Sequence, residues 1–353
     1  MAYLPAIAVM GTMPLRRSHA KSHHGCAQCK QRRIKCDEAR PVCGSCQRKQ
    51  LSCAFDSFAP PPSAASHAPL RDSVLPLQEL ELLHDWHTAT CASLVSARPL
   101  QDIMRTTLPQ EGLFSPFLLH GILAIAALRR AQTATESARS RQKYKDIAMA
   151  HHSSSLILCG QVLDNITQAN CHALFAFSCL VPIFIIATHK KGSIIDVVES
   201  FNLLRGAASV VDRARPWIEK GPLHPLLRLG HFYQPLSAAQ QQRGAALVIR
   251  IQSTMKNMPG MQLESSVRSS FESLLHLVQI YLSTGDERAV LAWPVQAETL
   301  YFDLLLQRNQ AAVTVLGLFG HALGIIPAHW WLEGWGMLLV TLSRECLGDP
   351  DLM

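Results

Sequence analysis

Residues 25–53 read GCAQCKQRRIKCDEARPVCGSCQRKQLSC, with six cysteines in the spacing C-x2-C-x6-C-x6-C-x2-C-x6-C. These cysteines are Cys26, Cys29, Cys36, Cys43, Cys46 and Cys53. The spacing is a tandem repeat of C-x2-C-x6-C, and thiolates are soft, charged ligands that can enclose a metal without a hydrophobic core. The stretch therefore predicts a small metal-held module with zinc as its natural occupant.

The number of cysteines determines how the metal is shared. Two separate four-coordinate zinc ions need eight ligands, and a single ion needs four. Six thiolates fit two ions only if two cysteines bridge both of them. We therefore expect two zinc ions that share six cysteines.

Two other uses of closely spaced cysteines fit poorly. A disulfide framework is typical of secreted proteins, but the apolar stretch 3–11 is short and has no basic residue before it, so we expect no secretory signal peptide. A redox-active C-x-x-C would lie in a βαβ pattern and would lack four further cysteines at repeat spacing. The remaining cysteines are scattered and odd in number, as expected of reduced thiols: Cys91, Cys159, Cys171, Cys179 and Cys346.

Positive charge is concentrated in the same part of the chain. Residues 1–53 hold ten lysines or arginines and two acids, a net charge of +8, whereas the whole chain is +7. Residues 54–353 therefore come to about −1 by difference, and a scaffold that binds only protein would not need this basic surface. So much positive charge on one small module predicts a polyanionic partner, and double-stranded DNA is the expected one.

The cysteine module resembles the fungal binuclear zinc cluster, a DNA-binding domain. The resemblance covers all six cysteines, the basic run of residues 30–35 and Pro41 in the connecting loop. It implies two tetrahedral zinc ions, with the first and fourth cysteines, Cys26 and Cys43, as the bridging ligands. It also implies recognition of CGG triplets, often by two modules at a set spacing, so a homodimer remains an open arrangement.

The basic run suggests how DNA is read. The stretch after Cys29 has no glycine or proline before Pro41, and we expect one or two helical turns there that enter the major groove. By position in the family motif, Arg33 and Arg32 are the expected base-reading residues. The other basic side chains are expected on phosphates or at the rim: Lys30 and Lys35 in the first repeat, Arg48 and Lys49 in the second.

Segments of biased composition flank the module. Residues 1–24 form a basic arm that, together with the basic run, predicts a nuclear localisation signal. His23 and His24 lie beside Cys26, but six thiolates already complete the cluster, so we interpret them as arm residues. With the module at 25–55, residues 56–76 are expected to be a linker rich in Pro, Ser and Ala, without a sustained heptad pattern beside it.

Residues 77–353 have helical periodicity and predict an all-α domain. Apolar residues recur at steps of three and four in three places. These are Leu77, Leu80, Leu83 and His87; Leu118, Ile122, Ile125 and Leu128; and Leu274, Leu277, Val278 and Tyr281. Breaks at 192–193, 221–222, 259–260 and 285–286 divide the region into roughly eight to eleven helices. The expected architecture is thus a small binuclear zinc-cluster module plus an all-α helical regulatory domain.

Two long stretches without charge, 165–189 and 309–332, raise the question of a membrane span. Polar residues, glycines and prolines interrupt both, and core helices of a large bundle are equally apolar. We expect no membrane span.

A second resemblance is to the fungal sterol uptake control transcription factors. It rests on residues 19–38, on 79–86 (ELELLHDW) and on 329–336 (HWWLEGWG). It implies a sterol-like or other apolar ligand in the helical domain, or a role in secondary-metabolite gene clusters, where relatives keep the same signature. The alternative for Trp330, Trp331 and Trp335 is core packing at helical spacing, with the nearby glycines allowing close helix approach.

These observations predict a nuclear, sequence-specific transcription factor that regulates RNA polymerase II. The alternative from another class is a zinc-containing co-regulator without base-specific readout. Because the sequence lacks G-x-S-x-G, H-E-x-x-H, Walker and G-x-G-x-x-G motifs, we expect the protein to have no enzymatic activity.

Overall fold

A computed structural model describes residues 25–39, 41–53, 76–134, 137–188, 192–257 and 264–348. The contacts divide the chain into two units, residues 1–75 and 76–353. The predicted basic arm, Arg40 and nearly all of the predicted linker lie outside the described residues.

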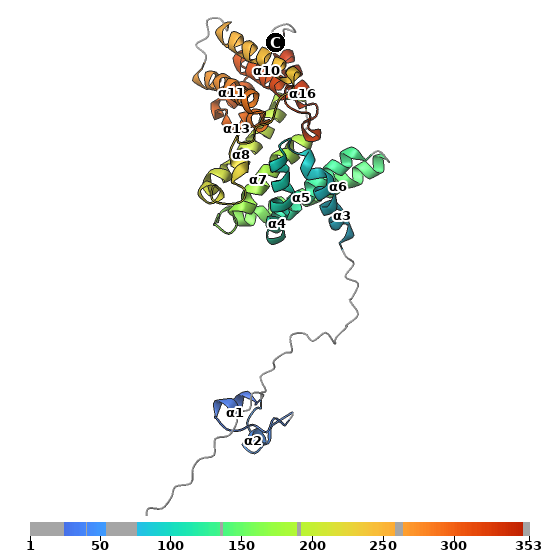
Figure 1. Ribbon diagram of the computed structural model, residues 1–353, viewed down its shortest axis with the longest axis vertical. Coiled ribbons are helices and arrows are strands. Elements are labelled where there is room, and N and C mark those ends of the chain that lie inside the picture. Colours follow the sequence, from blue (N-terminus) through green and yellow to red (C-terminus); the bar gives the residue numbers. More distant parts are fainter. Residues whose placement is uncertain are drawn as a thin grey trace, which may run out of the picture. The chain divides into compact units, whose positions relative to one another are not determined.

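The first unit contains two short helices that repeat one pattern, α1 (Ala27–Gln31) and α2 (Gly44–Gln47) (Figure 1). Cysteines that begin the two halves of the sequence repeat cap both helices. The Sγ of Cys26 accepts a hydrogen bond from the Cys29 N–H, and the Sγ of Cys43 accepts one from the Cys46 N–H, each at 3.4 Å. Each short helix therefore starts on a thiol.

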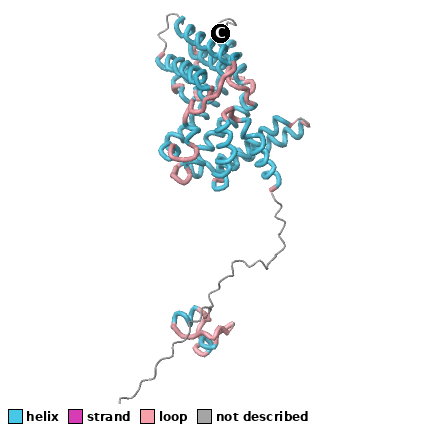
Figure 2. The backbone as a smooth tube through the Cα atoms, viewed as in Figure 1, coloured by secondary structure: helices cyan, strands magenta, loops and turns pink. Residues whose placement is uncertain are grey.

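The second unit is helical throughout its described part, as expected for the all-α domain (Figure 2). Eleven of its described helices have eight or more residues: α3 (Leu77–Asp85), α4 (Arg98–Phe114), α5 (Pro116–Thr133), α6 (Ala138–Leu163), α7 (Cys171–Thr188), α8 (Ile194–Ile218), α10 (Ala238–Asn257), α11 (Ser265–Thr284), α14 (Thr299–Leu306), α15 (Gln310–Leu323) and α16 (Trp335–Leu347). Short turns α9 (His224–Leu227), α12 (Arg288–Leu291) and α13 (Trp293–Gln296) join them. Three helix boundaries fall at predicted breaks: Ser193 caps α8, residues 221–222 follow it, and Gly285 ends α11 in the left-handed region.

The periodic apolar residues coincide with the buried face on two helices and not on a third. On α5 and α11 all eight residues of the pattern are buried. On α3, Leu77 and Leu80 are 66% and 48% exposed, whereas Leu82 and Trp86, which directly follows the helix, are buried. The Trp86 indole N–H donates to the Met104 carbonyl at 2.9 Å, so the large aromatic side chain determines which face turns inward.

The two uncharged stretches contribute α7 and α15 to the interior of the domain. Helix α7 is long and apolar enough to cross a membrane by length and composition, but 72% of it is buried inside the domain. It packs against α5 and α8, and α15 packs against α16. Core helices of large bundles are apolar on all sides for this reason.

The C-terminal tryptophans hold distant segments together. The helical spacing expected for them does not place them on one helix. Trp330 and Trp331 lie in a 3-10 turn (Trp330–Leu332), and Trp335 begins α16 after Gly334. The Trp330 indole donates to the Ser93 hydroxyl and the Trp331 indole to the Leu94 carbonyl, at 3.0 and 3.3 Å. The Trp335 indole donates to the Ile186 carbonyl at 2.7 Å. All three indole N–H groups are thus used within the fold, as core packing requires.

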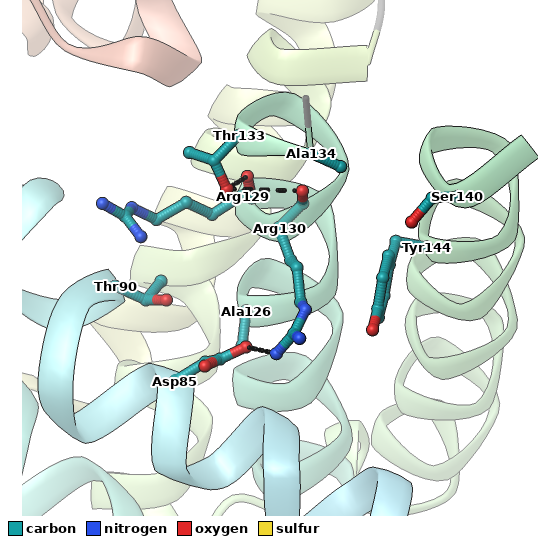
Figure 3. A pocket seen from close by; sticks show the side chains of 9 residues that line it. All are labelled: Asp85, Thr90, Ala126, Arg129, Arg130, Thr133, Ala134, Ser140 and Tyr144. Carbon is teal, nitrogen blue, oxygen red and sulfur yellow. Dashed lines mark hydrogen bonds and ion pairs between the residues drawn. The ribbon is translucent and has the colours of Figure 1, made fainter. Parts of the chain in front are cut away.

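Arg130 on α5 ties α3 to its neighbours beside a hollow of about 330 Å³ (Figure 3). Its guanidinium lies 2.5 Å from the Asp85 carboxylate and 2.7 Å from that of Glu81. It also lies over the Tyr144 ring of α6, 4.9 Å from the centroid. The positive charge of Arg130 is therefore paired within the protein itself.

Candidate metal centre and nucleic-acid interface

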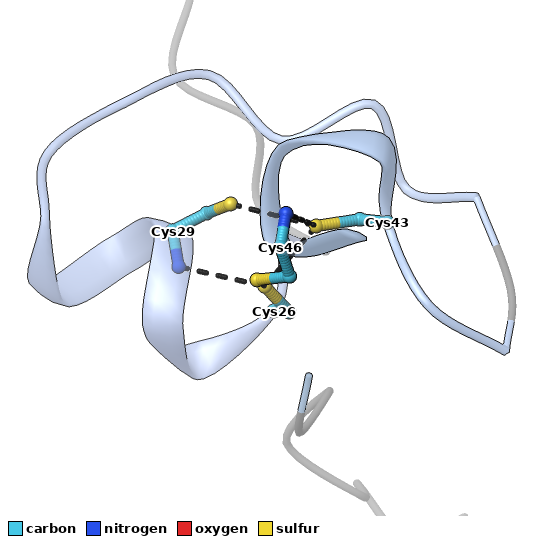
Figure 4. A group of neighbouring side chains, drawn as sticks. All are labelled: Cys26, Cys29, Cys43 and Cys46. Carbon is cyan, nitrogen blue, oxygen red and sulfur yellow. Dashed lines mark hydrogen bonds between the residues drawn. The ribbon is translucent and has the colours of Figure 1, made fainter. Parts of the chain in front are cut away.

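The predicted ligands converge in the first unit. The sulfur atoms of Cys26, Cys29, Cys43 and Cys46 all lie within 4.8 Å of one another and are buried (Figure 4). The closest Sγ–Sγ distances are 3.7 Å, far longer than a disulfide bond of about 2 Å, so these thiols are free. Ligands at 2.3 Å from a tetrahedral zinc ion lie about 3.8 Å apart. The spacing therefore fits thiolates gathered around zinc.

Cys26 and Cys43 are central in this group. Each of the three 3.7 Å contacts includes one of them: Cys26 with Cys43, Cys26 with Cys46, and Cys29 with Cys43. The Cys36 Sγ lies within 4.8 Å of that of Cys43, and the Cys53 Sγ accepts a hydrogen bond from the Cys43 N–H at 3.3 Å. Cys26 and Cys43, which the resemblance designates as bridges, thus each contact a thiol of the other repeat. A ligand shared by two ions needs such a central position.

The hydrogen bonds concentrate negative charge on the central pair. Burial disfavours the thiolate of Cys26, but the Cys29 N–H and neighbouring thiols outweigh it and lower the pKa of Cys26. The pKa of Cys43 is likewise lowered, because the Cys46 N–H and neighbouring thiols outweigh burial. Burial and neighbouring thiols raise the pKa of Cys46 to about 12. The backbone N–H groups at the starts of α1 and α2 thus favour the thiolate forms of Cys26 and Cys43, the forms that bind metal.

Both short helices end in the same way. The Ile34 N–H donates to the Cys29 carbonyl and the Arg33 N–H to the Lys30 carbonyl, each at 3.1 Å, a Schellman motif. The second repeat copies it through the N–H groups of Leu51 and Gln50. Arg33 and Gln50 occupy the left-handed position with φ of 51° and 50°. Position for position, Gln50 is thus the structural counterpart of Arg33.

The helix expected after Cys29 differs from the one observed. Helix α1 begins at Ala27, before Cys29, and ends at Gln31. It starts early because the Cys26 thiol caps it, and it stops where Arg33 turns left-handed. Arg32 and Arg33 therefore lie in the turn beyond the helix, so the sequence-based expectation of basic helical turns there is wrong.

The basic side chains cover the outside of the thiol cluster. All six predicted DNA-contacting residues are exposed: Lys30, Arg32, Arg33, Lys35, Arg48 and Lys49. The two repeats differ in charge, since the first has four of these residues and the second has two. The Arg48 guanidinium donates from Nε to the Gly44 carbonyl at 3.3 Å. The structure thus presents one strongly basic repeat and one weakly basic repeat.

Asp37 is a structural residue that the sequence-based reasoning missed. Its carboxylate accepts hydrogen bonds from the Gly44 N–H at 2.9 and 3.2 Å, which joins the first repeat to the start of α2. A Cβ at Gly44 would lie 2.6 Å from the Asp37 Oδ2, so a larger residue there would displace the Asp37 carboxylate. The signal in the sequence is an acid followed, seven residues later, by a glycine at a helix start, where carboxylates are favourable.

Comparison with known proteins agrees with this geometry. Residues 24–61 match the fungal Zn(2)-Cys(6) binuclear cluster domain, so this part of the chain is a domain that binds two zinc ions. The six cysteines would hold them, and the metal would supply the cross-links that a hydrophobic core supplies elsewhere.

Relatives extend the likeness beyond the zinc domain. A Zn(2)-C6 fungal-type transcription factor, afumD, of Aspergillus fumigatus is 30% identical over 217 residues, 56% of this chain and 56% of that protein. A Zn(2)-C6 fungal-type transcription factor of Gibberella zeae is 22% identical across 96% of this chain and 84% of its own length. Sterol uptake control protein 2 of Candida albicans is 55% identical over 40 residues, only 11% of this chain and 6% of that protein. The likeness to afumD thus spans about half of that protein, and the sterol-related likeness is confined to a short segment.

Proposed function

We propose that this protein is a nuclear, sequence-specific DNA-binding transcription factor that recognises CGG-type half-sites and regulates RNA polymerase II. The exposed basic repeat around a zinc-type thiol cluster supports the proposal most directly. The names of the two relatives that align beyond the zinc domain agree with it. No enzymatic activity is proposed.

Arg33 and Arg32 are the proposed base-reading residues. Both are exposed, and within residues 25–39 and 41–53 no ion pair involves either guanidinium. The turn that holds them is fixed at both sides by backbone hydrogen bonds of the Schellman motif. A preorganised arginine can donate two hydrogen bonds to O6 and N7 of one guanine, the commonest specific contact in the major groove.

The remaining basic residues are proposed to position the module on phosphates. Lys30 and Lys35 flank the arginine pair, and Arg48 and Lys49 lie in the second repeat. Gln50 stands where the first repeat has Arg33, so the second repeat lacks the corresponding guanidinium. We therefore assign base readout to the first repeat and backbone clamping to the second.

Residues 77–353 are proposed to be a regulatory domain that receives a signal, linked to the DNA-binding module by residues 56–76. Control of sterol or lipid genes, or of secondary-metabolite genes, is the proposed biological role. The short cluster-region likeness to sterol uptake control protein 2 supports the first of these.

A gel-shift series on the full zinc-loaded chain tests DNA readout. Duplexes that contain CGG should bind more tightly than scrambled duplexes at physiological salt. Arg33→Gln should lower affinity for the CGG duplex about 5- to 150-fold and relax specificity at one base pair. Glutamine already occupies the equivalent position 50, so this substitution changes the guanidinium while keeping a residue type that the turn accepts.

Lys49→Gln is the matched comparison in the second repeat. It should weaken binding to all duplexes alike and reduce the slope of log affinity against log salt by about 1. Equal binding of CGG and scrambled duplexes by the unaltered chain would reject base readout and favour the co-regulator alternative.

A further inference from the structure

A second hollow in the helical domain differs in charge from the one beside Arg130. It lies between α10, α15 and α16 and has a volume of about 460 Å³, within the usual range for small-molecule sites. Three arginines and a histidine line it: Arg243 and Arg250 from α10, His321 from α15 and Arg344 from α16. Asp and Glu are absent from its described lining. The hollow thus gathers the positive charges of three arginines from α10 and α16.

Within the described residues, no ion pair joins a carboxylate to Arg243, Arg250 or Arg344. Arg130, which lines the hollow of Figure 3, by contrast pairs with both Asp85 and Glu81. Repulsion between like charges that lack counter-charges lowers the stability of the fold. A group of unpaired arginines therefore suggests a role in binding a ligand.

The contact between Arg250 and His321 leaves the charge in place. Arg250 Nη1 lies 3.4 Å from His321 Nε2, and because guanidinium is only a donor, the ring nitrogen accepts. Burial, Arg250 and Arg344 all lower the pKa of His321, which keeps the imidazole neutral at pH 7. Burial and the nearby Arg344 also lower the pKa of Arg250. The histidine therefore orients Arg250 and supplies no negative charge.

The other residues that line this hollow are apolar. Leu247, Ile325 and Val340 line the same hollow. A neighbouring hollow of about 470 Å³ shares Gly324, Gly336 and Met337 with it and is lined by both apolar and polar residues, among them Ile326, Trp330 and Glu333. A cationic cluster beside an apolar surface matches a molecule with a charged head and an apolar body.

We propose that the hollow between α10, α15 and α16 binds an organic acid whose carboxylate lies among Arg243, Arg250 and Arg344 and whose apolar body covers Leu247, Ile325 and Val340. Charge-assisted hydrogen bonds between arginine and a carboxylate are strong and directional. The site is independent of the DNA-reading role proposed above and differs from a pocket for a neutral sterol by requiring a negative charge.

Isothermal titration calorimetry of the full zinc-loaded chain with octanoate tests the proposal. We expect saturable binding of octanoate, and at least about tenfold weaker binding of both 1-octanol, which lacks the charge, and sulfate, which lacks the apolar body. The double variant Arg250→Gln, Arg344→Gln should lower octanoate affinity at least about tenfold. Both substitutions leave the apolar core unchanged, and circular dichroism will check that the helices remain.

Arg268→Gln is the matched control, because Arg268 is an exposed arginine on α11 and does not line the hollow. It should leave octanoate binding unchanged. Octanoate without measurable binding, 1-octanol binding as tightly as octanoate, sulfate binding as tightly as octanoate, or an equal loss in Arg268→Gln would each overturn the proposal.

Discussion

Residues 25–53 and residues 76–348 fill their interiors with different chemistry. In the described part of the zinc module, the buried hydrophobic cluster consists of cysteines, and Ile34, Val42 and Leu51 are 38–41% exposed. In the helical domain, a continuous cluster of aliphatic and aromatic side chains extends from α3 to α16. A module of this size buries too little apolar surface to fold by itself, whereas some 270 residues can build a core. The metal therefore stabilises the fold of the short module, as the apolar core stabilises the fold of the long helical domain.

This difference separates the consequences of damage to the two regions. Losing the metal would remove the links between all six thiols of the module at once, because its buried cluster consists of cysteines. Losing one apolar side chain removes a small share of a large core. The two regions should accordingly fail independently, and zinc removal and the substitution Phe271→Ala test that expectation.

Removal of zinc should have the largest effect. A chelator, or the substitution Cys43→Ser at the centre of the thiol cluster, should unfold residues 25–53 and abolish DNA binding, because metal binding and folding are coupled in such modules. Most of the far-ultraviolet helix signal should remain, since the long helices lie in residues 76–348.

Cys159→Ser provides the comparison for that experiment. Cys159 is a buried cysteine on α6, outside the thiol cluster, and its replacement should leave the zinc content, measured by atomic absorption, unchanged. Global loss of helix upon chelation would show that the helical domain depends on the metal.

Phe271→Ala should produce the next largest effect, confined to the helical domain. Phe271 is fully buried on α11, and the cavity left by its ring should lower the free energy of unfolding by about 3–5 kcal/mol. Phe114→Ala is the matched control, because Phe114 is 88% exposed and should change stability by no more than about 0.5 kcal/mol. Urea unfolding followed by circular dichroism measures both, and loss of zinc from Phe271→Ala would contradict independence.

Gly320→Ala should have a smaller effect at the contact between α15 and α16. A Cβ at position 320 would lie 2.8 Å from the Gly336 carbonyl oxygen and 2.9 Å from a Val340 methyl group. Overpacking of this kind should destabilise the domain by about 1–3 kcal/mol.

Gly160→Ala tests the opposite case on α6, where nothing lies within 4 Å of the added carbon. It should stabilise the helix by about 0.5–1 kcal/mol, because alanine loses less conformational freedom than glycine. Thermal unfolding of both variants measures the sign, and destabilisation by both would refute the packing argument.

The sequence predicts the zinc module well because its chemistry is local. The ligand set is complete within 28 residues, and ligand type and spacing reflect the metal directly. The start of α1 was predicted less well, since a thiol cap is not among the usual helix signals. In the helical domain, the apolar periodicity coincides with the buried faces of α5 and α11 but not with that of α3, where Trp86 is buried and Leu77 and Leu80 are exposed.

The hollow with Arg243, Arg250 and Arg344 was not predicted from the sequence. Its residues come from helices widely separated along the chain, and each arginine alone resembles an ordinary surface side chain. Only tertiary packing places their charges together. The role of Asp37 was not predicted for a related reason, because its contact with Gly44 depends on how the two repeats fold together.

The tryptophan hydrogen bonds also affect how the protein is made. Trp330 and Trp331 bind segments 237 residues earlier in the chain, at Ser93 and Leu94. At synthesis rates of about 5–20 residues per second, the ribosome needs on the order of 10–50 s to produce the residues between these partners. The zinc module precedes both partners and can fold during this interval, whereas the segment with Ser93 and Leu94 gains these hydrogen bonds only after residues 330–331 have been made. Nascent chains should therefore be able to bind zinc early but should need chaperone protection of this segment until residues 330–331 emerge.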